Sequence, residues 1–398
     1  MRRDVTCGRL AGMIAALVLA QAPAAGPAAA QAAPVQAAKS DQQRKLEAYQ
    51  AARQKFEEEA SAYWTAIADK RRARNAKRRN NEEIVLEDYV LTQPPVYTGP
   101  PRPPGPSLEP EPLRRDYIPV VADFLQAAKE HFGFVPQRPR GEIEFKRAYA
   151  KVAVGAGISR DQAVRIYGFE VGGNGVYDTQ AGLEYSREAR AISTALGYNQ
   201  LLTTNSVNLL SEQGDLFIKT LKAKSAELNG TAKDVMEKKI GVLTRMVAFC
   251  RTVPNRWSEL EKLGNTPKGW GVHALNLDID VGPLLQTHKL LTSIVFARQK
   301  GFKGVLSAAE LEMMNLTGDG NGFDIVSMPA TLREQVPTSN FFQRAGYGRN
   351  PVAIRNNTVS KLLAVTDQRM DRAAMLQGAK NLAAAFESAV LYSGTTAD

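Results

Sequence analysis

The sequence predicts a mostly α protein, in which a charged helix and a proline-rich linker precede a larger helical domain. Beyond Leu113, apolar residues recur at helical rather than alternating spacing. Residues 93–112 read QPPVYTGPPRPPGPSLEPEP, and so many prolines exclude both helix and central strand. Residues 41–89 are charged and helix-prone. With 398 residues, 44% of them hydrophobic, the chain is long enough to fill a sizeable core.

Residues 1–30 resemble a cleaved signal peptide. Arg2 and Arg3 precede an apolar run from Leu10 to Ala20, which is about half of the ~20 residues that span a bilayer. Small residues follow, and cleavage is expected after Ala30; the alternative is a disordered, Ala-rich terminus. The chain is therefore expected to be periplasmic or secreted. Cys250 is then the one remaining cysteine, and its apolar neighbours predict a buried structural thiol.

The predicted order after the leader is an Ala-rich start and basic helix (31–92), a Pro-rich linker (93–113), a helical domain (114–385) and a flexible tail (386–398). Seven cations fall within the ten residues Lys70–Arg79. Such a block can bind an anionic envelope surface electrostatically. Nucleic acid is not expected as a partner of an exported protein. The alternative is a solvated helix face without a partner.

The helical domain is predicted from nine segments with helical periodicity. They are Tyr117–Phe132, Glu142–Val154, Arg160–Phe169, Arg187–Leu196, Ser206–Lys224, Ala232–Arg251, Val281–Lys300, Ala308–Met314 and Val352–Ala383. Three histidines, among them His273 and His288, are too few and too scattered for a metal centre, and the sequence has no Gly-rich phosphate loop. No cofactor or metal is therefore predicted. Leu316–Asp324 contains Asp-Gly-Asn-Gly, which predicts a tight turn rather than a calcium loop.

One predicted helix ends in an unusual carboxylate. Ser159 and Gln162 form a capping-box pattern, so the helix is expected to begin near Arg160. The glycines after Val171 favour a left-handed stop. Four residues of this helix share one face because they follow the i, i+3, i+4, i+7 spacing, namely Ala163, Ile166, Tyr167 and Glu170.

The position of Glu170 predicts a raised carboxyl pKa. Burial beside apolar residues disfavours the charged form, and the negative end of the helix dipole acts in the same direction. A carboxylic acid that stays protonated near neutral pH is what a glycosidase needs to protonate a glycosidic oxygen. The alternative is an ordinary ion pair of Glu170 with an arginine such as Arg165 or Arg190.

Two segments resemble the lysozyme-like superfamily, specifically lytic transglycosylases. The matching segments are Glu170–Asn174 and Gly197–Leu202 (GYNQLL). Gln200 of the second segment lies 30 residues after the glutamate. Val171 stands where the family usually has Ser, and Asn199 where it commonly has Met. Arg344–Pro351 is similar to the family's aromatic-Asn-x-Gly element. The resemblance covers about a third of the globular region and implies a lysozyme-like helical domain.

The resemblance implies a periplasmic enzyme that cleaves peptidoglycan at the MurNAc–GlcNAc bond, as a lytic transglycosylase or a muramidase. Glu170 would act as general acid and then as base, and Asp178 or Glu184 could supply a second carboxylate for hydrolysis. Peptidoglycan strands are the implied partner. The expected substrate-binding residues are Gly173, Asn174, Tyr177, Tyr198, Asn199, Gln200 and Tyr347.

Two other functions remain open at this stage. One is a non-catalytic relative that binds glycan or acts as an envelope scaffold. The other is an unrelated helical interaction protein that works through its basic block and Pro-rich linker. The sequence predicts neither a specific protein partner nor an oligomeric state.

Overall fold

The computed structural model describes residues 32–104, 117–173, 175, 178–180, 191 and 193–394, without the side chains of residues 32–40, 180 and 392–394. The chain divides into two units: unit 1 combines residues 1–58 with 96–110, and unit 2 combines residues 59–95 with 111–398. Helices dominate the described residues, which contain two isolated β-bridges and no strand. The prediction of a mostly α protein is therefore confirmed.

The helices of the N-terminal half begin and end as follows. They are α1 (Ala32–Arg79), the 3-10 turn η1 (Leu86–Asp88), α2 (Val121–Phe132), α3 (Glu142–Gly155), α4 (Arg160–Val171), η2 (Asp178–Gln180), α5 (Thr203–Ala226) and α6 (Gly230–Cys250). Five of the nine expected segments coincide with α2 to α6 to within a few residues. In the segment expected as helix at 187–196, residues 193–196 form a bend and a bridge rather than helix; residues 187–190 and 192 lie outside the described residues.

The C-terminal half contains α7 (Trp257–Gly264), α8 (Pro267–His273), η3 (Ala274–Leu277), α9 (Gly282–Gln299), α10 (Ala308–Thr317), α11 (Asp319–Val326), α12 (Ala330–Arg333), η4 (Thr338–Phe341), α13 (Arg344–Gly348), α14 (Pro351–Arg355), α15 (Val359–Ala374) and α16 (Gln377–Gly394). The helix expected at 352–383 is three helices. The tail expected from residue 386 is helical as far as Gly394, and Phe386 is fully buried.

Unit 1 consists, in its described part, of the first half of α1 and residues 96–104. Tyr97 packs edge-on against Phe56, with ring centroids 5.5 Å apart, and the Arg53 guanidinium lies 5.3 Å from the Tyr97 ring. Gln42 donates to the carbonyl of Pro104. This half of the segment predicted as a Pro-rich linker therefore packs on α1.

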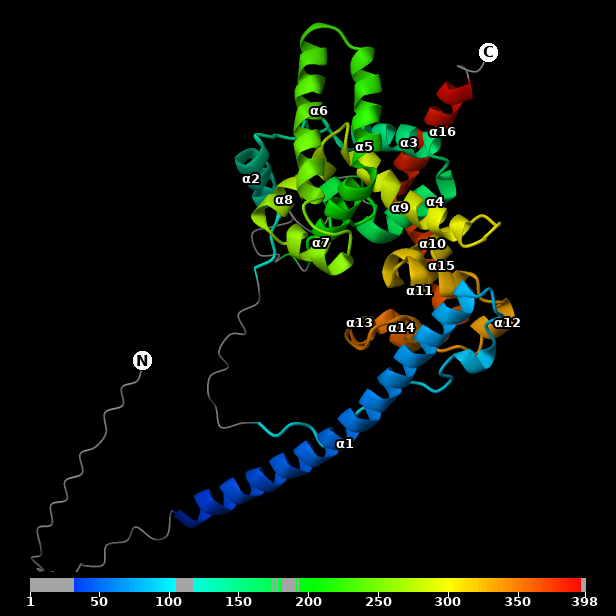
Figure 1. Ribbon diagram of the computed structural model, residues 1–398. Helices are drawn as coiled ribbons and strands as arrows, with labels where there is room; N and C mark the ends of the chain where they lie inside the picture. Colours follow the sequence, from blue (N-terminus) through cyan, green and yellow to red (C-terminus); the bar gives the residue numbers. More distant parts are fainter. Residues whose placement is uncertain are drawn as a thin grey trace, which may run out of the picture. The chain divides into compact units, whose positions relative to one another are not determined.

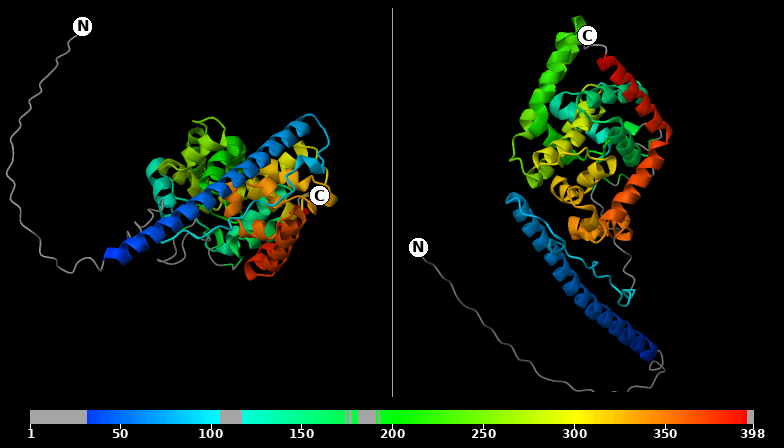
Figure 2. Two further views of the ribbon diagram at one scale, coloured as in Figure 1. Left: turned by 90° about the horizontal axis from the view of Figure 1, so that it is seen from below. Right: turned by 90° about the vertical axis from the view of Figure 1, so that its right-hand side faces the viewer.

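The described residues of unit 2 form three apolar clusters. The first is built from α2, α5 to α8 and the start of α9; the second from α3, α4, α9, α10, α15 and α16; the third from α11, η4, α13, α14 and the start of α15. α5 and α6 pack side by side as a hairpin (Figure 1). α15 and α16 follow one another along one side of the unit, where they contact α4 (Figure 2, right). The second cluster thus surrounds α4.

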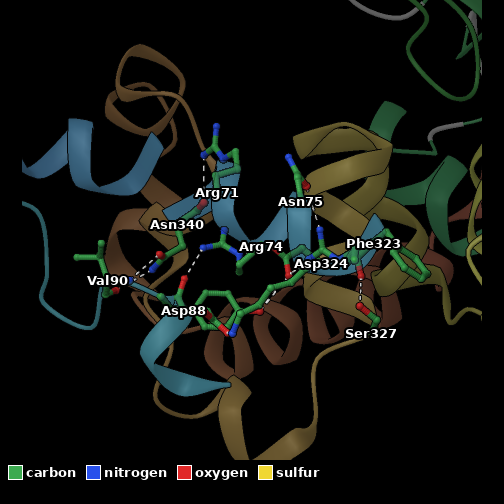
Figure 3. Close-up of polar contacts among 12 residues, drawn as sticks. Arg71, Arg74, Asn75, Asp88, Val90, Phe323, Asp324, Ser327 and Asn340 are labelled. Atoms are coloured by element: carbon green, nitrogen blue, oxygen red, sulfur yellow. Dashed lines mark hydrogen bonds and ion pairs between the residues drawn. The ribbon is translucent and has the colours of Figure 1, made fainter. Parts of the chain in front are cut away.

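The end of α1 belongs to unit 2, where buried polar contacts bind it to the rest of the unit (Figure 3). Arg74 is fully buried; its Nε donates to Asp324 of α11 at 2.7 Å and its Nη1 to the carbonyl of Asp88 at 2.9 Å. Arg78 also pairs with Asp324. Arg71 donates to the carbonyls of Asn340 and Phe342 at 3.0 Å. These cations bind the protein's own acceptors, and the exposed cations of the Lys70–Arg79 block are Arg72 and Arg79.

Cys250 is fully buried, and burial raises the pKa of its thiol to about 12. The prediction of a structural thiol is therefore confirmed. Within the described part of the chain, none of the helices combines the length and apolar character that crossing a bilayer requires.

Candidate active site

α4 begins and ends where the sequence predicted. The Ser159 hydroxyl accepts from the Gln162 N–H at 3.1 Å, and the Gln162 side chain accepts from the Ser159 N–H at 3.0 Å, which completes the capping box. Gly172 ends the helix in the left-handed region, at φ 74°. The side chain of Gln162 also donates to the carbonyl of Leu306 just before α10, at 2.8 Å. This contact fixes α4 against α10.

The predicted apolar face of α4 is confirmed, and Glu170 lies at its end. Ala163, Ile166 and Tyr167 are fully buried, whereas Glu170 is partly exposed. Burial raises the pKa of the Glu170 carboxyl from 4.5 to about 7, and hydrogen bonds and a nearby lysine limit the rise. Burial therefore favours the protonated form of Glu170 more than in an ordinary glutamate.

α10 supplies two polar partners of Glu170. The side-chain amide of Asn315 donates to Glu170 Oε1 at 2.8 Å. Glu312, one turn earlier, is buried, and its pKa is raised well above the usual value by burial and by the neighbouring charge of Glu170. Its Oε2 is buried and has no hydrogen-bond partner among the described residues. The two glutamates form a carboxyl pair.

α9 supplies the cation of this site. Burial lowers the pKa of the Lys289 ammonium, and the carboxyl groups of Asp319, Glu312 and Glu170 counteract that effect. Asp319, the first residue of α11, accepts a hydrogen bond from Ser293 of α9 at 2.6 Å. We call Glu170, Lys289, Glu312, Asn315 and Asp319 the Glu170 cluster.

The alternative role of Glu170, an ion pair with Arg165, is not what the structure shows. Arg165 lies between Asp367 and Asp371 of α15, to which it donates at 2.9 and 2.8 Å, with Asp161 at 3.6 Å. Arg190 lies outside the described residues. The charge of Arg165 is thus compensated by three carboxylates, and Glu170 turns instead to α9 and α10.

Asp178, one of two expected second carboxylates, belongs to another cluster. Its Oδ2 accepts from the Tyr167 hydroxyl, from the N–H of Gly175 at 2.6 Å and from Lys146 at 3.4 Å. Lys146 also pairs with Glu142 at 3.6 Å. Asp178 is therefore a fully buried structural group. Glu184 lies outside the described residues.

The segment that resembles a glycan-binding element, residues 197–202, folds as a tight turn against α9. Tyr198 is fully buried; its hydroxyl donates to Glu142 at 2.7 Å and its ring packs edge-on against Tyr167, with centroids 4.6 Å apart. Asn199 is also fully buried, and its N–H and side-chain amide donate to Gln286 at 2.8 and 2.7 Å. The prediction that Tyr198 and Asn199 contact sugar is therefore wrong for this structure, because both side chains are fully buried in the core.

The other expected substrate-binding residues are scattered. Gln200 is partly exposed, at φ 44°, and its side chain donates to the carbonyl of Gly197 at 3.0 Å. Gly173 is buried and accepts from the N–H of Gly378 at 2.6 Å. Tyr347 is buried in the third apolar cluster against Trp64 and Phe342, so its predicted sugar contact is also wrong. Asn174 and Tyr177 lie outside the described residues.

Comparisons of the chain with protein-family models, with curated proteins and with solved structures found no match. The Glu170 cluster must accordingly be interpreted from its own geometry. Among the described residues, no three His, Cys, Asp or Glu side chains gather as metal ligands. What the cluster offers is a partly exposed carboxyl whose pKa burial raises to about 7, a second carboxyl that interacts with it and, among the described residues, one nearby ammonium. Such a group can donate a proton and later accept one.

Sequence reasoning missed Glu312, Asn315 and Lys289. One signal for the first was present, because Glu312 interrupts the apolar run Leu311-Glu312-Met313-Met314, and a buried charge within such a run needs a partner. Nothing in the sequence identifies that partner, since Glu170 lies 142 residues earlier in the chain.

Proposed function

We propose that this chain is a periplasmic peptidoglycan-cleaving enzyme of the lysozyme-like type, a lytic transglycosylase or a muramidase. Glu170 is its general acid and base at the MurNAc–GlcNAc bond. One observation carries this proposal: Glu170 ends an apolar helix face, remains partly exposed, and has a pKa of about 7 because burial disfavours its charge. A pKa near the working pH is what general acid–base catalysis requires.

In the proposed reaction, protonated Glu170 gives its proton to the oxygen that bridges MurNAc and GlcNAc, and the bond from that oxygen to the MurNAc anomeric carbon breaks. The Glu170 carboxylate then takes a proton from a hydroxyl of the same muramoyl residue. That oxygen closes onto the anomeric carbon as an anhydro ring, and Glu170 is again protonated. If water supplies the hydroxyl, the product is a reducing end instead.

The carboxyl geometry favours a reaction that uses one carboxyl group. Retaining glycosidases hold their two carboxyls about 5–5.5 Å apart and inverting ones about 6.5–9.5 Å apart, so that the sugar fits between them. Glu312 is buried, and its carboxyl interacts directly with that of Glu170, so that each shifts the pKa of the other. No sugar ring fits between two such groups. Asp178 is occupied by Lys146 and Tyr167.

Digestion of murein sacculi tests the proposal. We expect the full chain, purified from the periplasm of a bacterial host, to release soluble muropeptides that carry anhydro ends in mass spectra. Reducing ends would identify a muramidase. If no fragments are released, the enzyme proposal fails; co-sedimentation of the intact protein with sacculi would then support the non-catalytic alternative, a glycan-binding or scaffold protein.

A further inference from the structure

α10 presents two side chains to Glu170 from one helix face. Glu312 and Asn315 are three residues apart, a spacing that places them one above the other on a helix. Asn315 donates to Glu170 Oε1 at 2.8 Å. Glu312 is buried, and its Oε2 has no donor among the described residues. A buried carboxyl oxygen without a donor is costly, unless the carboxyl itself carries a proton and donates.

We propose that Glu312 is a positioning residue that keeps its proton and donates it as a hydrogen bond to Glu170. The Glu170 carboxylate is then held by two donors of α10, Glu312 and Asn315. The catalytic meaning of this pair rests on the proposed function, whereas the hydrogen bond itself does not.

The surrounding charges agree with a neutral Glu312. Burial and the Glu170 carboxylate both raise its pKa well above the usual value, while the hydrogen bond from Glu312 lowers the pKa of Glu170. Among the described residues, Lys289 is the ammonium whose charge acts on both carboxyls, and the charge of Asp319 acts on it as well. One ammonium cannot balance three carboxylates in a buried site. Protonation of Glu312 removes one of these negative charges.

Charged groups on the other helices that pack against α4 face other partners. On α15, Asp367 and Asp371 pair with Arg165, and the Arg369 guanidinium lies 5.2 Å from the Phe169 ring. On α16, Glu387 pairs with the exposed Arg160 at 2.6 Å. The titration of Glu170 is therefore governed by burial and by groups on α9 and α10.

In the proposed reaction, Glu170 transfers protons and Glu312 only positions it. When Glu170 gives up its proton, the resulting carboxylate accepts hydrogen bonds from Glu312 and Asn315. Those bonds hold it in place until it takes the next proton. Glu312 never exchanges its own proton with substrate, so it is not a catalytic residue. Its hydrogen bond keeps the pKa of Glu170 from rising beyond the range in which both steps are possible.

Carbon-13 NMR titration of the glutamate carboxyls in the full chain tests the inference without any substrate. In the unaltered protein we expect Glu312 to keep its protonated chemical shift at a pH at which Glu170 has already ionised. Glu312→Gln supplies an amide donor in place of the protonated carboxyl, so the pKa of Glu170 is expected to change by less than ~0.5. Glu312→Leu removes the donor, and the pKa is expected to rise by about one to two units.

Three results would overturn the inference that Glu312 donates a hydrogen bond to Glu170. They are ionisation of Glu312 at a lower pH than Glu170, a fall of the Glu170 pKa toward 4.5 in Glu312→Gln, and an unchanged Glu170 pKa in Glu312→Leu. The fall would mean that Glu312 is charged in the unaltered protein. Glu310→Gln is the control on the same helix, because Gln retains the α10 capping box and loses only the charge of the pair with Arg333, 3.2 Å away. If the NMR titrations give the expected pKa values but the protein releases no fragments from sacculi, the proposed function fails. The inferred hydrogen bond between Glu312 and Glu170 is then still supported.

Discussion

Glu170→Gln protein is expected to lose about 10²- to 10⁴-fold of its glycan-cleaving rate, because an amide can neither donate nor recover the proton. The substitution keeps the size of the side chain and leaves an oxygen to accept from Asn315. The rate of muropeptide release from sacculi measures the effect. Glu237→Gln, on the exposed surface of α6, is the matched control and should cleave at the unaltered rate. Equal rates for both variants would remove Glu170 from the mechanism.

The same variant is expected to be more stable than the unaltered protein above neutral pH. The pKa of Glu170 is about 7 in the folded chain, against 4.5 for an ordinary glutamate. Below pH 4.5 the Glu170 carboxyl is mostly protonated in both the folded and the unfolded chain, so it does not lower the free energy of unfolding. Between pH 4.5 and 7 the unfolded chain ionises while the folded chain stays protonated, so the folded state loses about 3 kcal/mol, and the loss changes little above pH 7.

Urea unfolding at pH 4.5 and at pH 8 measures this difference. Glu170→Gln lacks the titration, so its advantage in free energy of unfolding should be small at pH 4.5 and approach about 3 kcal/mol at pH 8. A stability gain at the expense of activity is common where a protein holds a functional group in an unfavourable environment. An advantage that does not depend on pH would show that Glu170 is not held in its protonated form.

Local signals predicted α4 well and α11 poorly. The ends of α4 are encoded within the segment itself, by the capping box of Ser159 and by Gly172. α11 begins at Asp319 in a segment whose glycines predict a turn. Gly318 adopts φ 81°, and a Cβ at Gly322 would lie 2.3 Å from the Cα of Met314. The close packing of α11 on α10 therefore requires the glycines, and this tertiary contact outweighs their low helix propensity.

The segment expected as one helix at 352–383 forms three helices, because a cap and a close backbone contact act at positions that apolar periodicity does not detect. Thr358 caps α15 by accepting from the N–H of Lys361, and its backbone forms a bridge with Pro337. Gly378 packs against the carbonyl of Gly173, where a Cβ would lie 2.4 Å from that oxygen. Apolar spacing continues across both breaks, so the pattern alone predicts one long helix.

The sequence predicted Glu170 of the candidate site but not its partners, because only Glu170 is marked by the pattern of its own helix. The raised pKa of Glu170 follows from its own helix, since burial and position were visible in the spacing. Its partners come from α9 and α10 and are brought to it by packing of the second apolar cluster. The sugar contacts expected at Tyr198 and Asn199 failed because polar side chains beside Gly residues can equally be core groups that bind Glu142 and Gln286.

Removal of the Arg74 guanidinium is expected to have the largest effect on stability. Arg74→Met keeps the aliphatic volume of the side chain but leaves Asp324, which is 3% exposed, without its partner at 2.7 Å. It also removes the donor to the carbonyl of Asp88 and the contact with the Tyr89 ring, 4.3 Å away. Breaking a buried ion pair from one side costs about 3–5 kcal/mol; Arg78 still faces Asp324, so the lower end is expected.

Arg72→Met is the control, because Arg72 is exposed and pairs with Asp69 on its own helix, an interaction worth less than about 1 kcal/mol. Urea unfolding compares the two variants, and hydrogen exchange of residues 80–95 reports whether the end of α1 and η1 open locally. If the two variants lose equal stability, the Lys70–Arg79 block does not anchor α1, and its cations are available to an external anionic surface. A loss confined to Arg74→Met means that the basic block serves mainly to hold α11, whose first residue is Asp319 of the Glu170 cluster.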